Sequence, residues 1–419
     1  MPQSSRTFSM LNLIAIRVAA LLLVLVGFGA TTTFAQPKAY VANRFSNTVS
    51  VIDSATNTVI ATVPVGTIPS VIAVTPDGAF AYVTNTTSNT VSVISGATNT
   101  VVATIPVGPV PTGIAITPDG AFAYVASADA NNVSVIDTAT NTVIATVPVG
   151  QSPFGVTVTP DGAFVYVANQ LSDTISVIDT STNTVTATIS APSVPVFIAF
   201  TPDGSTAYVT NINSNTVSVI DTATNTVTAV IPVAPLPFAL DITPDGAFVY
   251  VVTQLINAVT VIDTATNTIV TTVPVGSTPI GIAISPDGAF AYVTNTLGNS
   301  VSVINIATNT VIATIPVGTG PSGIAFPTRG RASSIDSLIA QVQALVAADS
   351  LDANKSRGLI AKLEQVQIKI DNGQTAAACN QLGAFINQVN AFIKNGSLTA
   401  SQGQALIDAA NAIRTSLGC

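Results

Sequence analysis

Short segments in which apolar and polar residues alternate recur along most of the chain. Within one unit, GIAIT from Gly113 ends at a PDG turn and AFAYVA begins at Ala121. NVSVID follows from Asn132, and VIATVPV follows a TATNT loop from Val143. Alternation, β-branched residues and Pro-Asp-Gly turns are typical of short antiparallel strands. Each unit therefore predicts four strands and no helix.

The unit repeats every 42 residues. The aspartate of the PDG turn recurs at Asp77, Asp119, Asp161, Asp203, Asp245 and Asp287, and the seven tyrosines keep the same spacing. The next step reaches Arg329, in the altered turn PTRG. Four strands in every forty-odd residues favour a propeller blade. The sequence thus predicts an all-β seven-bladed propeller.

The phase of the repeat predicts how the ring closes. The array begins on a second strand, AYVAN from Ala39, and ends on a lone first strand, SGIAF from Ser322. We expect this last strand to complete the first blade, which then has three N-terminal strands and one C-terminal strand. Such closure pairs two strand edges that would otherwise be open to aggregation.

The motif YVTN occurs at residues 82–85, 208–211 and 292–295, together with SVIDTATNTV and TPDG. These motifs resemble the YVTN-repeat propellers of bacterial and archaeal surface proteins. The resemblance implies a secreted or surface-exposed seven-bladed propeller. It implies little about chemistry, because the same fold also serves lactonases and amine-dehydrogenase subunits.

The composition changes at Arg329, where Ala, Gln and Leu replace Thr, Val and Pro. Apolar residues then follow helical spacing in four stretches, and Thr399 with Gln402 predicts a capping box. The segment from Leu382 to Ile413 resembles the helical module called FIMAH, found at the C-termini of secreted bacterial proteins. We therefore expect a propeller over 36–328 and a small all-α domain of four helices over 329–419.

The N-terminus has the features of a secretory signal. Arg6 and Arg17 precede an apolar run at residues 18–30, and the small residues Thr33 and Ala35 follow it. We place the signal peptide at 1–35. An uncleaved anchor is the alternative, although the run is short for a membrane span. With cleavage, no membrane span remains, and we expect an extracellular, cell-surface or periplasmic protein.

Charged residues are only 8% of the chain, the net charge is −8, and His is absent. Between Arg44 and Arg329 there is no Lys or Arg, but there are fourteen Asp. A surface without cations cannot neutralise phosphates, which argues against nucleic acids and anionic membranes as partners. Without His, the commonest general base is also missing.

The repeated aspartates admit two interpretations. Those of the PDG turns, and Asp137, Asp179, Asp221 and Asp263 of the DTATNT loops, offer rings of oxygen ligands. A calcium loop, however, has several carboxylates close in sequence, whereas each loop here has one. We favour the second interpretation, in which each aspartate caps its own turn. The sequence therefore predicts no metal site and no cofactor.

Two further features stand apart from the repeat. Asp241 lies in an expected inner strand where the other units have Ala or Thr, so it is either a ligand or acid in the channel or the result of drift between the units. Cys379 and Cys419 are the only cysteines. We expect them to form a disulfide that stabilises the helical domain by about 4 kcal/mol in the chain-entropy model.

The differences between units gather in two loops, which we expect to open on the same face of a propeller. One joins the second and third strands, and the other leads through Pro into the inner strand. The candidate binding face comprises Phe154, Val196, Leu236, Phe238, Ile280, Phe45, Leu171 and Leu255. Large apolar residues in loops favour a protein or peptide partner, or else they plug the channel mouth and pack on neighbouring loops.

These features favour a binding scaffold outside the cytoplasm, with no catalytic constellation. Two alternatives stay open: a lactonase-type hydrolase that uses the central channel, and a structural component of a surface layer. The sequence does not fix the oligomeric state.

Overall fold

The computed structural model describes residues 38–327, 335, 338–339, 341–343, 345–346, 351–371, 374–417 and 419. The expected signal peptide at 1–35 and the altered turn at Arg329 lie outside the described residues.

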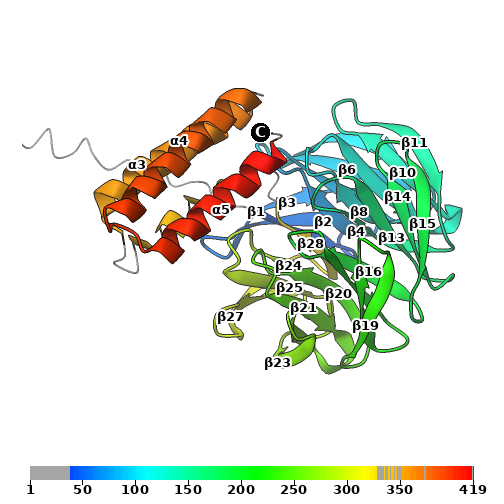
Figure 1. Ribbon diagram of the computed structural model, residues 1–419. Coiled ribbons are helices and arrows are strands. Elements are labelled where there is room, and N and C mark those ends of the chain that lie inside the picture. Colours follow the sequence, from blue (N-terminus) through cyan, green and yellow to red (C-terminus); the bar gives the residue numbers. More distant parts are fainter. Residues whose placement is uncertain are drawn as a thin grey trace, which may run out of the picture. The chain divides into compact units, whose positions relative to one another are not determined.

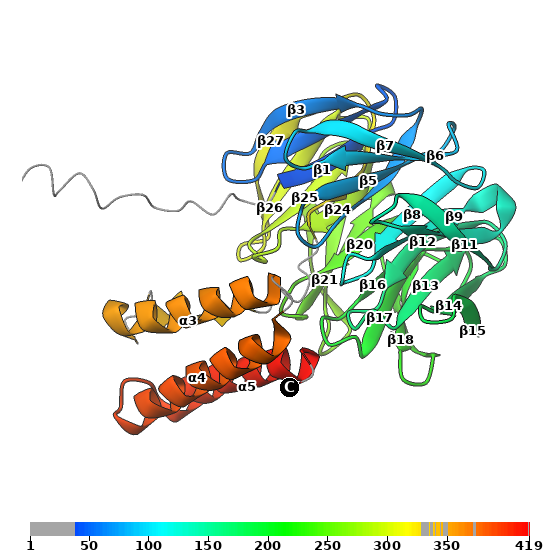
Figure 2. The same cartoon turned by 90° about the horizontal axis from the view of Figure 1, so that it is seen from above.

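Residues 38–327 form seven sheets, each of four antiparallel strands, arranged as a ring of blades (Figures 1 and 2). The innermost strands are β28 (Pro321–Ala325), β4 (Pro69–Val74), β8 (Pro111–Ile116), β12 (Pro153–Val158), β16 (Pro195–Phe200), β20 (Pro237–Ile242) and β24 (Pro279–Ile284). The second strands are β1 (Lys38–Asn43), β5 (Phe80–Asn85), β9 (Phe122–Ser127), β13 (Phe164–Asn169), β17 (Thr206–Asn211), β21 (Phe248–Thr253) and β25 (Phe290–Asn295).

The third and fourth strands lie further from the ring axis. The third strands are β2 (Thr48–Asp53), β6 (Thr90–Ser95), β10 (Asn132–Asp137), β14 (Thr174–Asp179), β18 (Thr216–Asp221), β22 (Ala258–Asp263) and β26 (Ser300–Asn305). The outermost strands are β3 (Thr58–Pro64), β7 (Thr100–Pro106), β11 (Thr142–Pro148), β15 (Thr184–Ser190), β19 (Thr226–Pro232), β23 (Thr268–Pro274) and β27 (Thr310–Pro316). Two short 3₁₀ turns are η1 (Ala128–Ala130) and η2 (Gln254–Ile256).

The predicted closure of the ring is confirmed. The first blade has the strand order β28-β1-β2-β3, and β28 pairs antiparallel with β1, with Tyr40 opposite Ala325. The other six blades each use four consecutive strands. The two ends of the array are thereby joined in one sheet.

The hydrophobic core lies between neighbouring blades. Seven clusters of buried side chains each combine residues from two adjacent blades, as when Tyr124 and Val133 pack with Val165 and Ile178. The central residues of a third strand such as β10 are therefore buried on both faces, whereas an outermost strand such as β3 alternates exposed and partly buried residues, with Val63 fully buried. This difference explains why the third strands contain almost no charge between their ends.

The Tyr and Thr of the YVTN motif join neighbouring blades. The Oη of Tyr208 donates a hydrogen bond to Asn267 Oδ1 of the next blade at 2.9 Å. The Oγ1 of Thr84 donates to the carbonyl oxygen of Thr112, in the innermost strand of the next blade, at 2.8 Å. Both groups are shielded from water, so these bonds fix the angle between blades.

The Asn of the same motif acts within its blade. The Nδ2 of Asn85 donates to Thr90 Oγ1 at 3.1 Å and to Ser92 Oγ at 2.9 Å, both on the third strand. The Val side chain enters the core. Every position of the motif therefore has a structural role, and the motif itself carries no chemistry.

The C-terminal region contains α3 (Ala353–Asp371), α4 (Thr375–Lys394) and α5 (Ala400–Ser416), and the described residues between 335 and 346 are also helical. They share one apolar core that contains Leu338 and Phe385. The predicted capping box is present: Thr399 N donates to Gln402 Oε1, and Gln402 N donates to Thr399 Oγ1. None of the helices described is both long and apolar enough to cross a bilayer.

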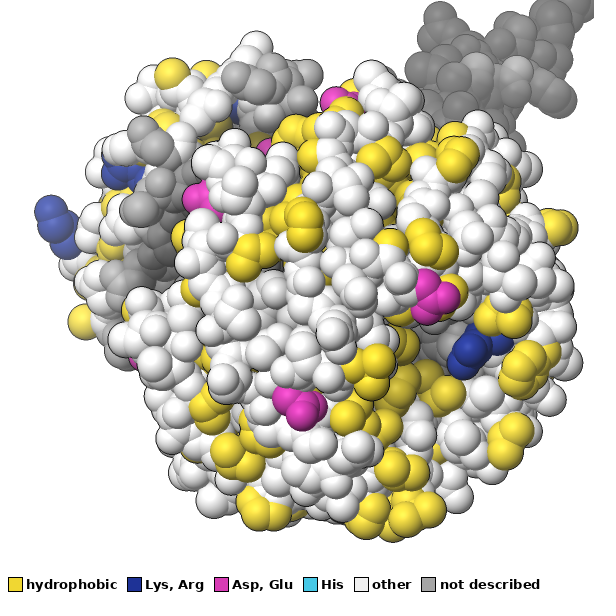
Figure 3. All heavy atoms as spheres, turned by 90° about the vertical axis from the view of Figure 1, so that its right-hand side faces the viewer, with side chains coloured by type: hydrophobic (Ala, Val, Ile, Leu, Met, Phe, Trp, Pro, Cys, Tyr) yellow, Lys and Arg dark blue, Asp and Glu magenta, His cyan; other side chains and the backbone are white. Residues whose placement is uncertain are grey.

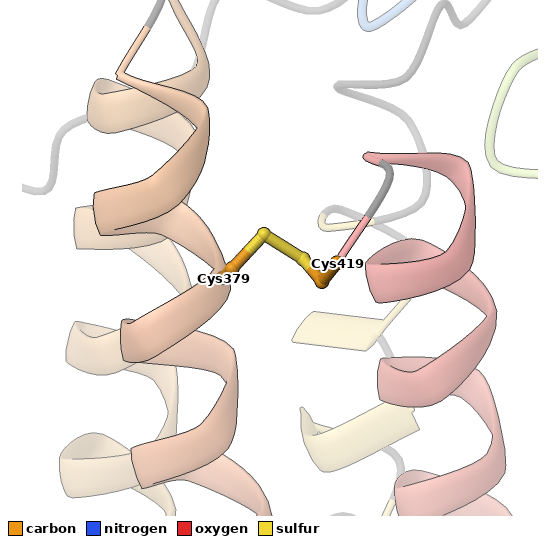
Figure 4. The surroundings of a disulfide bond; sticks show 2 residues. All are labelled: Cys379 and Cys419. Atoms are coloured by element: carbon orange, nitrogen blue, oxygen red, sulfur yellow. A yellow bond between two sulfur atoms is a disulfide. The ribbon is translucent and has the colours of Figure 1, made fainter.

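Cys379 and Cys419 form the expected disulfide, which ties α4 to the end of the chain (Figure 4). Their Cα atoms are 5.9 Å apart, and the bond closes a separation of 40 residues. A small helical core of this kind gains from such a crosslink, because the bond restricts its unfolded chain.

Candidate binding face at the channel mouth

Two loops from each blade meet at one end of the channel, which we call the mouth face. They are the loop between the second and third strands and the loop that leads into the innermost strand. Backbone hydrogen bonds join them, as from Thr86 N to the carbonyl oxygen of Ile68 at 2.9 Å. The side chain of Asn47 adds a second link, because its Oδ1 accepts from Ile68 N at 2.9 Å. The two loops therefore lie on the same face.

In each loop that leads into an innermost strand, one residue has a left-handed backbone. These residues are Ile68, Val110, Ser152, Val194, Leu236, Thr278 and Gly320, with φ between 51° and 66°. Only glycine adopts this conformation without cost, and β-branched residues adopt it least readily. The mouth face therefore stores backbone strain that the surrounding hydrogen bonds hold in place.

Three phenylalanines from neighbouring innermost strands form an aromatic cluster at the mouth. The rings of Phe154 and Phe197 have centroids 5.5 Å apart, those of Phe154 and Phe238 5.8 Å, and those of Phe197 and Phe238 5.5 Å. All three pairs meet edge to face, a favourable arrangement for aromatic rings. The cluster borders a cavity of about 80 Å³, together with Ile280 and Arg44.

Val196 requires a correction. Its side chain is completely buried, so it is not part of an exposed face. Phe197, the next residue along β16, lies against the other two rings instead. The sequence interpretation missed Phe197, although one signal existed: four of the seven units have glycine at this position.

The tips of four mouth loops carry large apolar side chains. Phe45 is 66% exposed, Leu171 72%, Leu255 65% and Leu297 68%. Leu236 is also exposed, whereas Phe154, Phe238 and Ile280 are half-buried around the cavity. The predicted residues thus divide into an exposed outer set and a partly buried inner set. Figure 3 shows one side of the molecule, with scattered hydrophobic side chains and few charged ones.

Asp241 lies deeper in the channel and joins two innermost strands. Its Oδ1 accepts from Ile242 N, and its Oδ2 accepts from Ile284 N of β24, each at 2.8 Å. The residue is partly exposed, but desolvation by the surrounding strands raises the pKa of its carboxyl to about 6, although both hydrogen bonds act to lower it. Thr157 links two other innermost strands through its bond to the carbonyl oxygen of Ile198 at 2.7 Å.

The repeated aspartates cap their own turns. The Oδ1 of Asp119 accepts from Thr117 Oγ1 at 2.6 Å and from Ala121 N at 3.0 Å. In the other loop, hydrogen bonds from Thr140 lower the pKa of Asp137. Among the residues that the structure describes, no three acidic or cysteine side chains come together as a metal site.

Comparisons with known proteins agree with this architecture. The YNCE-like β-propeller family matches residues 24–122, 79–164 and 115–214, and the seven-bladed lactonase propeller family matches residues 184–316. The FIMAH domain matches residues 335–415. No curated protein matches the chain.

Several solved structures share the fold. Hydrazine synthase of Kuenenia stuttgartiensis is 26% identical with a TM-score of 0.58, over 63% of this chain and 90% of that chain. A functionally unknown protein from Desulfotomaculum acetoxidans is 20% identical with a TM-score of 0.61, and periplasmic gluconolactonase of Pseudomonas aeruginosa is 21% identical with a TM-score of 0.60. Each of these two matches covers 69% of this chain and 98% of the other, and at such identity the likeness shows the fold alone.

The ring of seven four-stranded blades and these matches lead to one assignment. The chain is a seven-bladed β-propeller whose blades match the YNCE-like and lactonase propeller families, followed by a helical region that matches the FIMAH domain.

Proposed function

We propose that this protein is an exported, non-catalytic binding scaffold, and that its partner docks on the mouth face. The observation that carries the proposal is the exposure of Phe45, Leu171, Leu255 and Leu297 at the loop tips. These side chains do not contribute to the cores between blades, and they lie in the loops in which the units differ most. Exposed apolar residues at such positions favour an interaction site. The partner is a protein or peptide with an apolar surface of its own.

Export is the second part of this proposal. Cleavage after Ala35 would leave a propeller over 36–328 and a helical domain over 329–419. The Cys379–Cys419 disulfide supports an oxidising destination. N-terminal sequencing of protein recovered from outside the cytoplasm should begin at Gln36, and a thiol assay without reductant should find no free cysteine. An N-terminus upstream of Gln36, or two free thiols, would contradict this part.

The binding role is tested by a combined variant of the loop tips: Phe45→Ser, Leu171→Ser, Leu255→Ser and Leu297→Ser. A matched control replaces exposed apolar residues on the outermost strands: Ile60→Ser, Ile144→Ser and Ile312→Ser, whose side chains are 48%, 52% and 52% exposed. Both variants should fold, because surface substitutions of this kind change the free energy of unfolding little.

The readout is crosslinking in the native organism, followed by identification of the crosslinked proteins. We expect the tip variant to lose the partners that the wild-type protein captures, and the control variant to keep them. Equal loss in both variants, or no loss in either, would overturn the assignment of the mouth face.

A lactonase-type hydrolase is the second candidate, because the lactonase family match includes Asp241 and this carboxyl has a pKa near neutrality. In that case the purified protein should open a lactone ring, and Asp241→Asn should abolish the activity without unfolding the propeller. Assays over a panel of lactones, with and without added divalent metal, decide the question. Turnover that depends on Asp241 would replace the scaffold proposal.

A further inference from the structure

Arg44 is the only Lys or Arg between residues 39 and 327. It lies in the mouth loop between β1 and β2 and borders the cavity formed by Phe154, Phe197, Phe238 and Ile280. Arg44, which is with Lys38 one of two cations in the described propeller, is therefore placed beside the aromatic cluster of the mouth face.

The guanidinium of Arg44 has no protein partner. Within the part of the chain that the structure describes, its side chain makes no hydrogen bond and no ion pair, and its Nε is buried without an acceptor. Arg44 as a whole is partly exposed, and Nε is the buried atom of its guanidinium. A buried donor without an acceptor is costly, and a carboxylate is the partner that matches the planar donors of a guanidinium. The N–H groups of Arg44 are therefore available to donate hydrogen bonds to the two oxygens of a carboxylate.

Comparison between blades shows that the ring does not need a cation here. At the equivalent position, Thr86 Oγ1 donates to the carbonyl oxygen of Pro111 at 3.1 Å, and Thr296 Oγ1 donates to that of Pro321 at 2.7 Å. In the first blade the corresponding acceptor is Pro69, and its carbonyl oxygen accepts from Ser322 Oγ at 3.3 Å. Ser322 thus supplies the donor that Thr86 and Thr296 supply in their blades. The other four units have Ala128, Gln170, Ile212 and Gln254 at this position, so no other blade places a cation here.

The cavity sets the size of the apolar part of the ligand. Its volume is about 80 Å³, about half of the 150 Å³ cavity that accepts benzene in another protein. Three phenylalanines, three isoleucines and Leu240 are among the residues that line it, so it suits a compact branched aliphatic group of three or four carbons. The guanidinium beside it favours a ligand that also carries an acceptor, because a purely apolar ligand would leave the buried Nε unpaired.

We propose that the mouth binds a carboxylate attached to a compact aliphatic group, with the carboxylate on Arg44 and the aliphatic group against the three phenylalanines. This inference rests on the proposed binding role of the mouth face and names the chemistry recognised there. Two sources share that chemistry: a free branched-chain acid, and the C-terminal residue of a partner protein that ends in Val or Leu.

Calorimetric titration of the full mature chain tests the proposal with matched probes. The probes are 3-methylbutanoate, its uncharged amide, and an acetylated peptide that ends in Leu with either a free carboxylate or a C-terminal amide. We expect the carboxylates to bind and both amides to bind at least tenfold more weakly. Tighter binding of the free peptide than of 3-methylbutanoate identifies a protein C-terminus as the source, and the reverse order identifies a free acid.

Two variants locate the site. Arg44→Gln should weaken carboxylate binding at least tenfold, with an unchanged melting temperature. Lys38→Gln, which removes the same charge elsewhere in the propeller, should leave binding unchanged. The inference is overturned if neither carboxylate binds at millimolar concentration, if amides bind as well as carboxylates, or if Arg44→Gln binds like wild type. In those cases, loss of partners in the loop-tip variant would still uphold the scaffold role, so the two claims fail separately.

Discussion

The two ends of the propeller are built from the same repeat. They differ in how many of their side chains find partners within the propeller. At the end that carries the PDG turns and the hairpins between third and fourth strands, aspartates cap turns and tyrosines reach the next blade, as for Asp119 and Tyr124. At the mouth face, leucines protrude, β-branched residues adopt left-handed backbone, and Arg44 lacks a partner. Seven repetitions keep the first end uniform because folding needs it. The second end is free to differ, and that is where we place binding.

The largest expected contrast between the two ends comes from two aromatic truncations. Tyr124 is completely buried between blades, so Tyr124→Ala should lower the free energy of unfolding by about 3–5 kcal/mol. Phe154 at the mouth is only half-buried, so Phe154→Ala should cost about 1–2 kcal/mol. Urea unfolding of both variants measures the difference. Equal losses would show that the mouth cluster is as much a part of the core as the tyrosines are.

The channel that joins the two ends should give stability an unusual dependence on pH. Asp241 has a folded-state pKa of about 6, above the value of about 3.9 for an unfolded Asp. The folded state therefore holds the proton more tightly, and the stabilisation present below pH 4 is lost as the pH rises to about 6.

The full loss should amount to about 3 kcal/mol, of which about 2 kcal/mol falls between pH 4.5 and 7. Unfolding of wild type and Asp241→Asn at pH 4.5 and 7 isolates the effect, because other carboxylates cancel in the comparison. The wild-type advantage should shrink at the higher pH. A difference that does not change with pH would show that Asp241 titrates normally in the channel.

A smaller effect is expected from the hydrogen bonds between blades. Thr84→Val keeps the shape of the side chain but removes the donor to the carbonyl oxygen of Thr112. The buried acceptor then lacks its partner, which should cost about 1–2 kcal/mol. Thr98→Val, on an exposed hairpin, is the matched control and should change stability by less than about 0.5 kcal/mol. Similar losses in both variants would argue against a special role for the motif threonine.

The smallest expected effect is a gain in the free energy of unfolding, from a substitution at Val110. Val110 has φ of 54°, a conformation that asparagine tolerates much better than valine. Val110→Asn should therefore raise the free energy of unfolding by about 1 kcal/mol, because it relieves strain. Ser152→Asn, at the same position of the next blade and without a β-branched side chain, should gain less. Destabilisation by Val110→Asn would mean that the valine side chain packs usefully at the mouth.

Much of the fold could be predicted from the sequence, because a repeat of 42 residues presents the same local signals seven times. The strands, the closure by β28, the capping box at Thr399 and the disulfide all follow from patterns that are local or that come in pairs. The arrangement of side chains at the mouth face was harder to predict from the sequence. Phe154 and Phe238 directly follow the proline of their strands, whereas Phe197 is the second residue after Pro195. Alignment of the units therefore does not place its ring with the other two, although the structure does.

The hydrogen bond to the carbonyl oxygen of Pro69, beside Arg44, could also not be predicted from the sequence. It depends on Ser322, which bonds to the carbonyl oxygen of Pro69 from 253 residues away in the chain. Only the closed ring brings these residues together. A comparison of aligned repeats shows that this position varies between units, with Thr in two of the other six, but not which side chain donates to the carbonyl oxygen of Pro69.

The measurement that tests the central claim most directly is site-specific photocrosslinking from three places on the propeller. A photoreactive phenylalanine derivative would replace Leu171 at the mouth, Ile144 on the outer rim, or Ala139 at the opposite end, all of which are exposed. The account predicts a discrete partner adduct from position 171 and none from positions 139 and 144. Adducts mainly from position 139 or 144, with none from 171, would contradict it and place the binding surface elsewhere.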